Sequence, residues 1–151
     1  MTDPAFTLRP YIPADEAATI ELWRQTWQAA YPHFDFTARL DWWRERWRTE
    51  LVPVATIVVA ECSDGLVGFV TVDQSNGYLD QIVVAPRAWR ANIGAALLAE
   101  ARRIAPEGLD LHVNADNARA IAFYRKHGFA ESGRDVNARS GAPVLKMSWR
   151  P

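Results

Sequence analysis

The sequence has a single cysteine, Cys62, and no long hydrophobic run. One cysteine excludes a disulfide within the chain and any metal site built from a cysteine cluster. No stretch reaches the roughly 18 apolar residues typical of a membrane-spanning helix, and residues 1–13 lack the apolar core of a secretory signal peptide. We therefore expect a cytoplasmic protein without a membrane partner, in which Cys62 is a buried, small hydrophobic residue of a strand.

An excess of charge of either sign is also missing, since the 151 residues include 17 basic and 18 acidic ones. Proteins that bind nucleic acid through a basic face normally carry a clear positive excess, so we expect no nucleic-acid partner. The length suits one domain with a full hydrophobic core, and residues 1–151 are predicted to form a single domain. What the sequence does have is aromatic side chains, including seven tryptophans.

The order of hydrophobic segments and turn residues predicts an α/β fold of the α+β type. Strands are expected at Phe6–Arg9, Ala55–Cys62, Leu66–Asp73, Tyr78–Val84, Leu109–Asn114, Phe129–Asp135 and Val144–Trp149. Helices are expected from Asp15 to about Tyr31, at Phe36–Glu50 with Thr37 as N-cap, at Asn92–Ala105 and at Asn117–His127. Because a helix connects the fourth strand to the fifth, these two must be parallel, whereas the other neighbours form antiparallel hairpins.

Aromatic residues dominate the first two predicted helices. Trp23 and Trp27 have the spacing of a core-facing stripe. Trp42 and Trp43 are adjacent and cannot share one helix face, so one of them is expected to line a groove or to protrude. The arginines of the second helix are expected to form a solvated face; they are Arg39, Arg44, Arg46 and Arg48.

The second half of the sequence contains a strand–loop–helix pattern twice. The first copy is Tyr78–Leu98, with Gly94 near the helix start, and the second is Leu111–Phe129, whose helix ends at Gly128. A helix N-terminus that follows a strand offers free N–H groups and a positive dipole end, which suit a phosphate. Two such units side by side make a crevice at the C-terminal ends of neighbouring strands.

These two segments read V-x-P, a loop, I-G-x-x-L-L, a strand and N-x-x-A-x-x-F-Y-x-x-x-G-F. The residues are Val84, Pro86, Ile93, Gly94, Leu97, Leu98, Asn117, Ala120, Phe123, Tyr124, Gly128 and Phe129. The pattern resembles that of the GNAT superfamily of acetyl-CoA-dependent N-acetyltransferases. The resemblance implies a GNAT-like, mostly antiparallel sheet with one central parallel pair and about four flanking helices. It also implies acetyl-CoA as co-substrate, no metal, and direct attack of a primary amine on the thioester.

By resemblance, the loop before the third helix wraps the pyrophosphate of acetyl-CoA with its main chain. Its residues are Trp89, Arg90, Ala91, Asn92, Ile93, Gly94 and Ala95. Relatives usually read R/Q-x-x-G-x-G/A here; aligned without a gap from Pro86, Trp89 replaces the Arg or Gln and Asn92 the first Gly. A shift by one residue would instead put Arg90 first. Because asparagine tolerates positive φ better than other non-glycine residues, the loop can keep its shape.

Further cofactor contacts are implied on the strand before this loop and on the last helix. The main chain of Ile82, Val83 and Val84 is expected to accompany the pantetheine arm like an additional strand. Asn117 is expected both to cap its helix and, by resemblance, to contact the same arm.

Two side chains are the candidates for catalysis. Tyr124 follows Asn117 by seven residues, where many relatives place a tyrosine near the cofactor sulfur, and a phenol can protonate the leaving thiolate. The alternative is a core tyrosine. His112 lies where the ribosomal-protein N-terminal acetyltransferases of the superfamily carry a glutamate base, and an imidazole can take a proton near neutral pH. A satisfied strand histidine is the alternative, with Asp80 or a water chain as the base.

The sequence does not identify the acceptor, which is expected to be the amine of a small molecule or of a peptide. One alternative is a protein N-terminal acetyltransferase of the ribosomal-protein type. Another is a non-catalytic acyl-CoA-binding sensor, which the altered loop at Trp89 and Asn92 favours and the retained Tyr124 disfavours. A monomer or a homodimer is expected, since the superfamily often dimerises.

Overall fold

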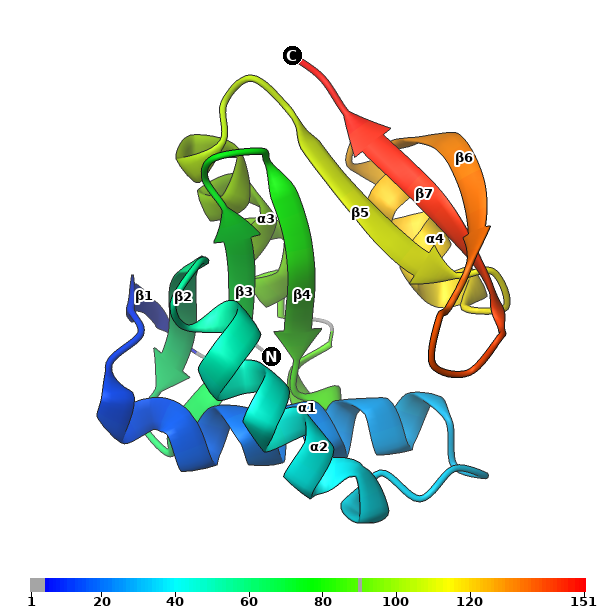
Figure 1. Cartoon of the computed structure of the whole chain (residues 1–151). Coiled ribbons are helices and arrows are strands. Elements are labelled where there is room, and N and C mark those ends of the chain that lie inside the picture. Colours follow the sequence, from blue (N-terminus) through cyan, green and yellow to red (C-terminus); the bar gives the residue numbers. More distant parts are fainter. Residues whose placement is uncertain (1–4, 90) are drawn as a thin grey trace.

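The computed structural model describes residues 5–89 and 91–151. A seven-stranded sheet lies at its centre, in the order β1-β2-β3-β4-β5-β7-β6 (Figure 1). The strands are β1 (Thr7–Pro10), β2 (Thr56–Cys62), β3 (Gly65–Asp73), β4 (Tyr78–Val84), β5 (Leu109–Asn114), β6 (Ala130–Val136) and β7 (Pro143–Trp149). The α-helices are α1 (Glu16–Ala30), α2 (Leu40–Arg46), α3 (Ile93–Ile104) and α4 (Ala118–Lys126). All neighbouring strands are antiparallel except β4 and β5, which confirms the predicted fold class.

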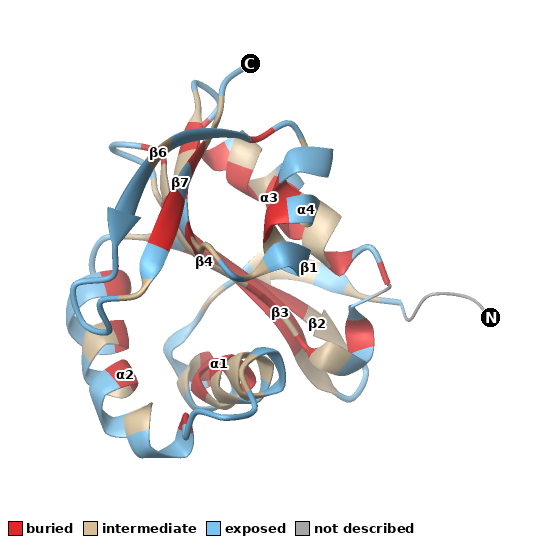
Figure 2. Cartoon of the chain, turned by 90° about the vertical axis from the view of Figure 1, so that its right-hand side faces the viewer, coloured by how far each residue is buried: buried red, intermediate tan, exposed pale blue. Residues whose placement is uncertain are grey.

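Helices cover both faces of the sheet. α1 and α2 lie on one face, and α3 and α4 on the other (Figures 1 and 2). β2 and β3 are therefore buried on both faces, with continuous burial from residue 57 to 60 and from 67 to 72. The edge strand β6 is exposed along nearly its whole length. None of the helices in the described ranges is both long and apolar enough to cross a membrane.

Stacked tryptophans join α1 to α2. Trp23 and Trp43 lie parallel with their ring centroids 4.5 Å apart, and Trp43 is only 1% exposed. Its neighbour Trp42 is 39% exposed and faces the β6–β7 loop, where the Arg139 guanidinium lies 4.1 Å from its ring centroid. The prediction that these two adjacent rings serve different faces is confirmed.

The second predicted helix is less regular than its sequence pattern. A 3₁₀ turn (Thr37–Arg39) precedes α2, and a π-helical turn (Trp47–Leu51) follows it. The predicted Thr37 cap is wrong, because the Asp35 carboxylate accepts the Ala38 N–H at 3.1 Å and so satisfies the first turn. The predicted burial of Cys62 is also wrong: it ends β2, is half-buried, and its thiol donates to Asp64 at 2.6 Å.

Candidate active site

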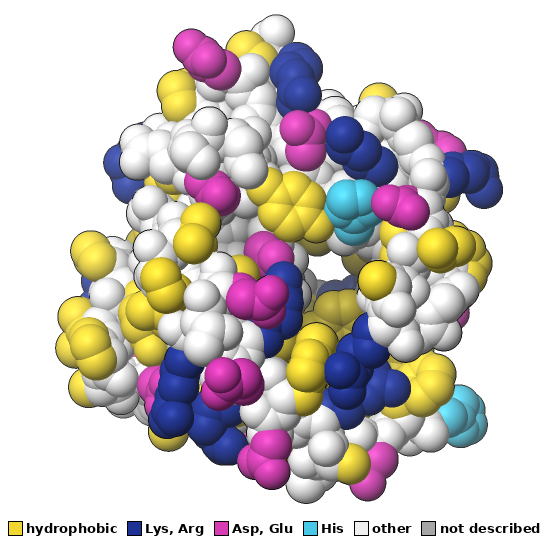
Figure 3. Space-filling model, viewed as in Figure 1, with side chains coloured by type: hydrophobic (Ala, Val, Ile, Leu, Met, Phe, Trp, Pro, Cys, Tyr) yellow, Lys and Arg dark blue, Asp and Glu magenta, His cyan; other side chains and the backbone are white. Residues whose placement is uncertain are grey.

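β4 and β5 are paired at one end only. Their register contains the single pair Tyr78–Asp110, next to which the Asp110 N–H donates to the Gly77 carbonyl at 3.0 Å. Beyond this point the strands diverge toward their C-terminal ends (Figure 1). The surface is deeply hollowed there, and hydrophobic side chains, a histidine and charges of both signs border the opening (Figure 3). We call the opening between β4 and β5 the fork.

One arm of the fork is an open strand edge. The Ala85 N–H donates to the Val67 carbonyl at 2.8 Å, so Ala85 and, two residues earlier, Val83 turn their main chain toward β3. Ile82 and Val84 therefore turn theirs toward the fork, where β5 no longer pairs with them. Of the three predicted strand residues, the structure places only Ile82 and Val84 with main-chain groups on this edge; Val83 faces β3 and is buried.

The loop after β4 turns through a left-handed residue. Asn92 has φ 61° and ψ 13° and is the one non-glycine residue of the described chain with positive φ. It is the N-cap of α3, and its carbonyl accepts the Ala96 N–H at 3.1 Å. The expectation that asparagine can adopt a positive φ in this loop is thus confirmed. Arg90, the one charged candidate of this loop, lies outside the described residues.

The start of α3 approaches α4 closely at Gly94. A Cβ added at Gly94 would lie 3.2 Å from the Phe123 ring, tighter than ordinary van der Waals contact. The first-turn N–H groups of Ile93, Gly94 and Ala95 lie at the positive end of α3, where a helix has no internal acceptors for them. The Ala91 side chain is buried in the core.

Trp89 anchors the loop to the end of β4. Its indole N–H donates to the Val84 carbonyl at 2.8 Å, and the Arg119 guanidinium of α4 stacks 3.4 Å from its ring centroid. The side chain of this tryptophan, which replaces the usual Arg or Gln, is thus hydrogen-bonded to the end of β4. With the Val84 carbonyl bound by Trp89, the main-chain groups that remain on the fork edge are the Val84 N–H and the N–H and carbonyl of Ile82.

Tyr124 lies on α4 and is only 9% exposed. Its ring contacts Phe123 and Phe129, at centroid distances of 5.5 and 5.6 Å. Burial raises the pKa of Tyr124 well above the usual range of a phenol, so the hydroxyl stays protonated. At the start of the same helix the Asn117 side chain accepts the Ala120 N–H at 3.2 Å, which confirms its cap role.

His112 projects from β5 on the polar side of that strand. Leu111 and Val113 are buried whereas His112 is exposed, as the alternation predicts. Its Nδ1 lies 2.8 Å from the hydroxyl of Tyr78 on β4, across the closed end of the fork. Burial, followed by the nearby Asp80 carboxylate, raises the pKa of Tyr78 to about 12.

Asp80, the competing base, is bound to an arginine. The register of β3 and β4 skips Asp80, so it is the extra residue of a β-bulge, a feature that redirects a side chain. Its two carboxylate oxygens accept from the Arg46 guanidinium at 2.9 and 2.6 Å. The predicted solvated face of α2 is therefore wrong for Arg46, whose side chain is only 25% exposed. Protonation of Asp80 would break this bidentate pair.

A tyrosine ties α1 to the β5–α4 turn. The Tyr31 hydroxyl donates to Asp116 at 2.8 Å and accepts from the Asn114 amide at 3.1 Å. Burial raises the pKa of Tyr31 to about 12. No local sequence pattern indicates this link, because the partners of Tyr31 are 83 and 85 residues away.

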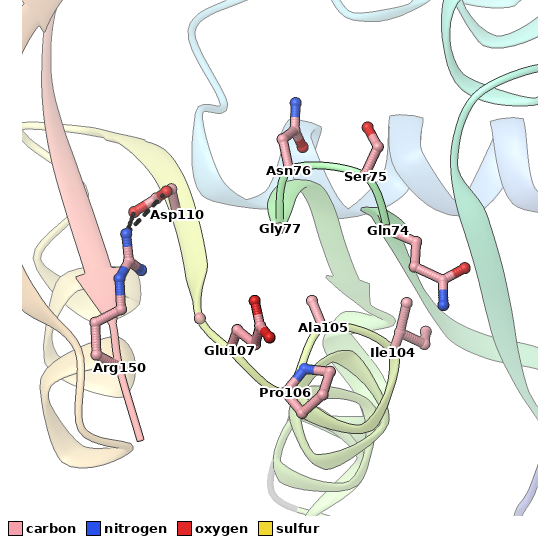
Figure 4. Close-up of a pocket in the computed structure, with 11 residues that line it drawn as sticks. Gln74, Ser75, Asn76, Gly77, Ile104, Ala105, Pro106, Glu107, Asp110 and Arg150 are labelled. Carbon is pink, nitrogen blue, oxygen red and sulfur yellow. Dashed lines mark hydrogen bonds and ion pairs between the residues drawn. The ribbon is translucent and has the colours of Figure 1, made fainter.

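Two pockets of the described surface lie away from the open end of the fork. One, of about 380 Å³, lies beyond the closed end and includes the Asp110–Arg150 ion pair at 3.2 Å (Figure 4). The other, of about 580 Å³, adjoins β1 and Cys62. Among residues 5–89 and 91–151, no group of three or more His, Cys, Asp or Glu side chains could hold a metal ion.

Comparison with known proteins agrees with this geometry. Residues 17–129 match the Acetyltransferase (GNAT) family. The chain is 32% identical over 145 residues to a mycothiol acetyltransferase of Kineococcus radiotolerans, with 89% of this chain and 46% of that protein covered; it thus spans about half the length of that relative. It is 30% identical over 125 residues to the peptidyl-lysine N-acetyltransferase YjaB of Salmonella typhimurium, with 82% of this chain and 83% of that protein covered.

Solved structures share the fold. The apo form of YjaB from Escherichia coli has a TM-score of 0.79 at 25% identity, covering 96% of this chain and 97% of that one. The PaiA N-acetyltransferase of Thermoplasma acidophilum, solved in complex with coenzyme A, has a TM-score of 0.77 at 20% identity. That match covers 97% of this chain and 99% of the other.

Proposed function

The chain belongs to the GNAT family of acetyltransferases and is an acyltransferase enzyme, and we propose that it moves acetyl from acetyl-CoA to a primary amine. The observation that carries this proposal is the fork, which opens a strand edge directly before a helix N-terminus. Residues 1–151 act as one catalytic domain in this proposal.

The main chain supplies the cofactor contacts. Ile82 and Val84 offer main-chain groups with the spacing of one strand edge, which an extended amide-containing arm can match. The N–H groups of residues 92–95 face the pyrophosphate at the positive end of α3. A coenzyme A complex of a structural neighbour supports this assignment by analogy of fold.

The side chains supply the proton transfers. The amine must lose a proton before it attacks, and His112 on the polar side of β5 takes it. The thiolate must gain one as the C–S bond breaks, and Tyr124 gives it. Desolvation that raises the pKa of the phenol also makes a nearby thiolate more basic, so the two remain matched inside the protein.

The acceptor class is tested by an amine panel. The relatives of this chain include a mycothiol acetyltransferase and a peptidyl-lysine N-acetyltransferase. The panel therefore contains small-molecule amines, lysine peptides and peptides with free N-termini. Thiol release from acetyl-CoA is measured for each, after calorimetry has established binding. Binding without turnover on any amine would contradict the proposal and favour a sensor of acyl-CoA.

Asn92 provides a matched pair of variants for the phosphate loop. Asn92→Gly keeps the left-handed turn and should leave the Kd of acetyl-CoA within about threefold. Asn92→Val places a β-branched residue at φ 61° and should weaken binding by about tenfold or more, because the first turn of α3 moves. Calorimetry measures both, and equal affinities of the two variants would show that the loop does not carry the phosphates.

His112→Gln tests the base. An imidazole accepts a proton only when neutral, so wild-type turnover should fall once the pH is low enough for the ring to be protonated. Gln keeps some hydrogen bonding but does not titrate; the variant should be slower by roughly 10²-fold and should lose the acidic limb. The measurement is the pH dependence of kcat/KM in both proteins. A profile of His112→Gln that equals that of the wild type would assign the role of the base to Asp80 or to water instead.

A further inference from the structure

Tyr78 and His112 face each other across the closed end of the fork. The Tyr78 hydroxyl and the His112 Nδ1 are 2.8 Å apart, and the two ring centroids are 5.7 Å apart. Tyr78 is half-buried at the start of β4, whereas His112 is exposed on β5. The pair therefore joins a sheltered hydroxyl to a ring that is open to solvent.

The direction of this hydrogen bond follows from the needs of the phenol. A half-buried O–H needs an acceptor, and within the described residues the hydrogen-bond partner of the Tyr78 hydroxyl is the His112 Nδ1. Burial raises the pKa of Tyr78 to about 12, so the phenol keeps its proton at neutral pH and can donate it. Neutral His112 then carries its own proton on Nε2. The basic nitrogen of His112 is thus covered by Tyr78.

We propose that Tyr78 and His112 act as a pair, in which the Tyr78 hydroxyl accepts the proton of the acceptor amine while it passes its own to His112 Nδ1. The inference rests on the proposed acetyl transfer. An N–H bond of the ammonium breaks and an O–H bond forms on Tyr78; the former O–H bond of Tyr78 breaks as the Nδ1–H bond forms. The imidazolium releases a proton to the solvent. Tyr78 is a neutral phenol before and after the step, so no tyrosinate accumulates.

The charges around the pair suit this route. Asp80 and Arg46, the charged neighbours of Tyr78, neutralise each other in a bidentate pair. Lys146 on β7 lies directly opposite His112 in the register. Asp110, on the same side of β5, is occupied by Ser148 and Arg150.

Tyr78→Phe tests the pair with the ring retained. With an amine that the wild type acetylates, kcat should fall roughly 10- to 100-fold, while the Kd of acetyl-CoA stays within about twofold. Tyr11→Phe is the matched control, because Tyr11 is also half-buried and bonded to a ring nitrogen, that of Trp47 at 3.1 Å, outside the fork. It should retain wild-type turnover.

Two further readouts separate a proton route from a packing effect. If the residues work as a unit, Tyr78→Phe added to His112→Gln should slow turnover by no more than about twofold beyond His112→Gln alone. Nitrogen-15 spectra of the ring should show the Nε2–H tautomer in the wild type and a changed Nδ1 resonance in Tyr78→Phe. His112→Gln identifies the resonance among the three histidines.

Wild-type turnover in Tyr78→Phe, an equal loss in both backgrounds, or an Nδ1–H tautomer in the wild type would each overturn the pair. These results leave acetyl transfer itself intact. A wild-type protein that acetylates no amine would overturn the proposed function as well, and this outcome is seen without any variant.

Discussion

Tyr124→Phe should fold normally, bind acetyl-CoA with wild-type affinity and lose turnover by roughly 10²–10⁴-fold, the usual contribution of a positioned acid. The substitution removes one hydroxyl and keeps the ring contacts with Phe123 and Phe129. Stability should therefore change by less than about 1 kcal/mol. Thiol release at saturating acetyl-CoA and amine measures the loss, and calorimetry checks the affinity.

The pH dependence gives a second check on Tyr124. Because burial raises its pKa, the phenol keeps its proton through the whole working range and remains available as an acid. We expect no alkaline fall in wild-type activity from this group below about pH 10, where an unperturbed tyrosine would begin to titrate. Wild-type turnover in the purified variant would reduce Tyr124 to a packing residue of α4.

Local features of this site could be predicted from sequence because local rules govern them. Strand alternation is enough to place His112 on the face of β5 opposite the buried Leu111 and Val113. The tolerance of asparagine for positive φ predicted the turn at Asn92. Adjacency on a helix predicted that Trp42 and Trp43 would serve different faces. Each of these depends on a few consecutive residues.

The features that make the fork depend on residues far apart in sequence. The Tyr78–His112 and Arg46–Asp80 contacts each join residues 34 positions apart, and no periodicity relates their members. The bulge at Asp80 redirects that side chain, and no glycine at this position indicates the bulge in the sequence. The separation of β4 from β5 cannot be predicted from either strand, because each has the composition of a normally paired one. The open edge could therefore be predicted only from the resemblance to the GNAT superfamily.

Gly77→Ala should destabilise the protein by about 3 kcal/mol, because the glycine satisfies two constraints at once. Its φ is +75°, in the left-handed region, where an L-residue loses roughly 1–2 kcal/mol. A Cβ at this position would also overlap the carbonyl oxygen of Gly108, and such overpacking costs about 1–3 kcal/mol. The Gly77 carbonyl accepts the Asp110 N–H beside Tyr78–Asp110, the single pair in the β4–β5 register of the described chain.

Gly141→Ala is the matched control for that prediction. Gly141 has nearly the same φ, +73°, but no heavy atom lies within 4 Å of its added Cβ. It should therefore show the backbone cost alone, about 1–2 kcal/mol. Urea unfolding measures both variants, and the difference between their free energies of unfolding isolates the clash at the closed end of the fork. Equal losses would mean that Gly108 moves aside freely, and that the junction from which β4 and β5 diverge is not a rigid support for the site.

If the junction is rigid, Gly77→Ala should also reduce turnover in the folded fraction, because the clash moves the Tyr78 end of β4 relative to His112. Gly141→Ala should leave turnover unchanged.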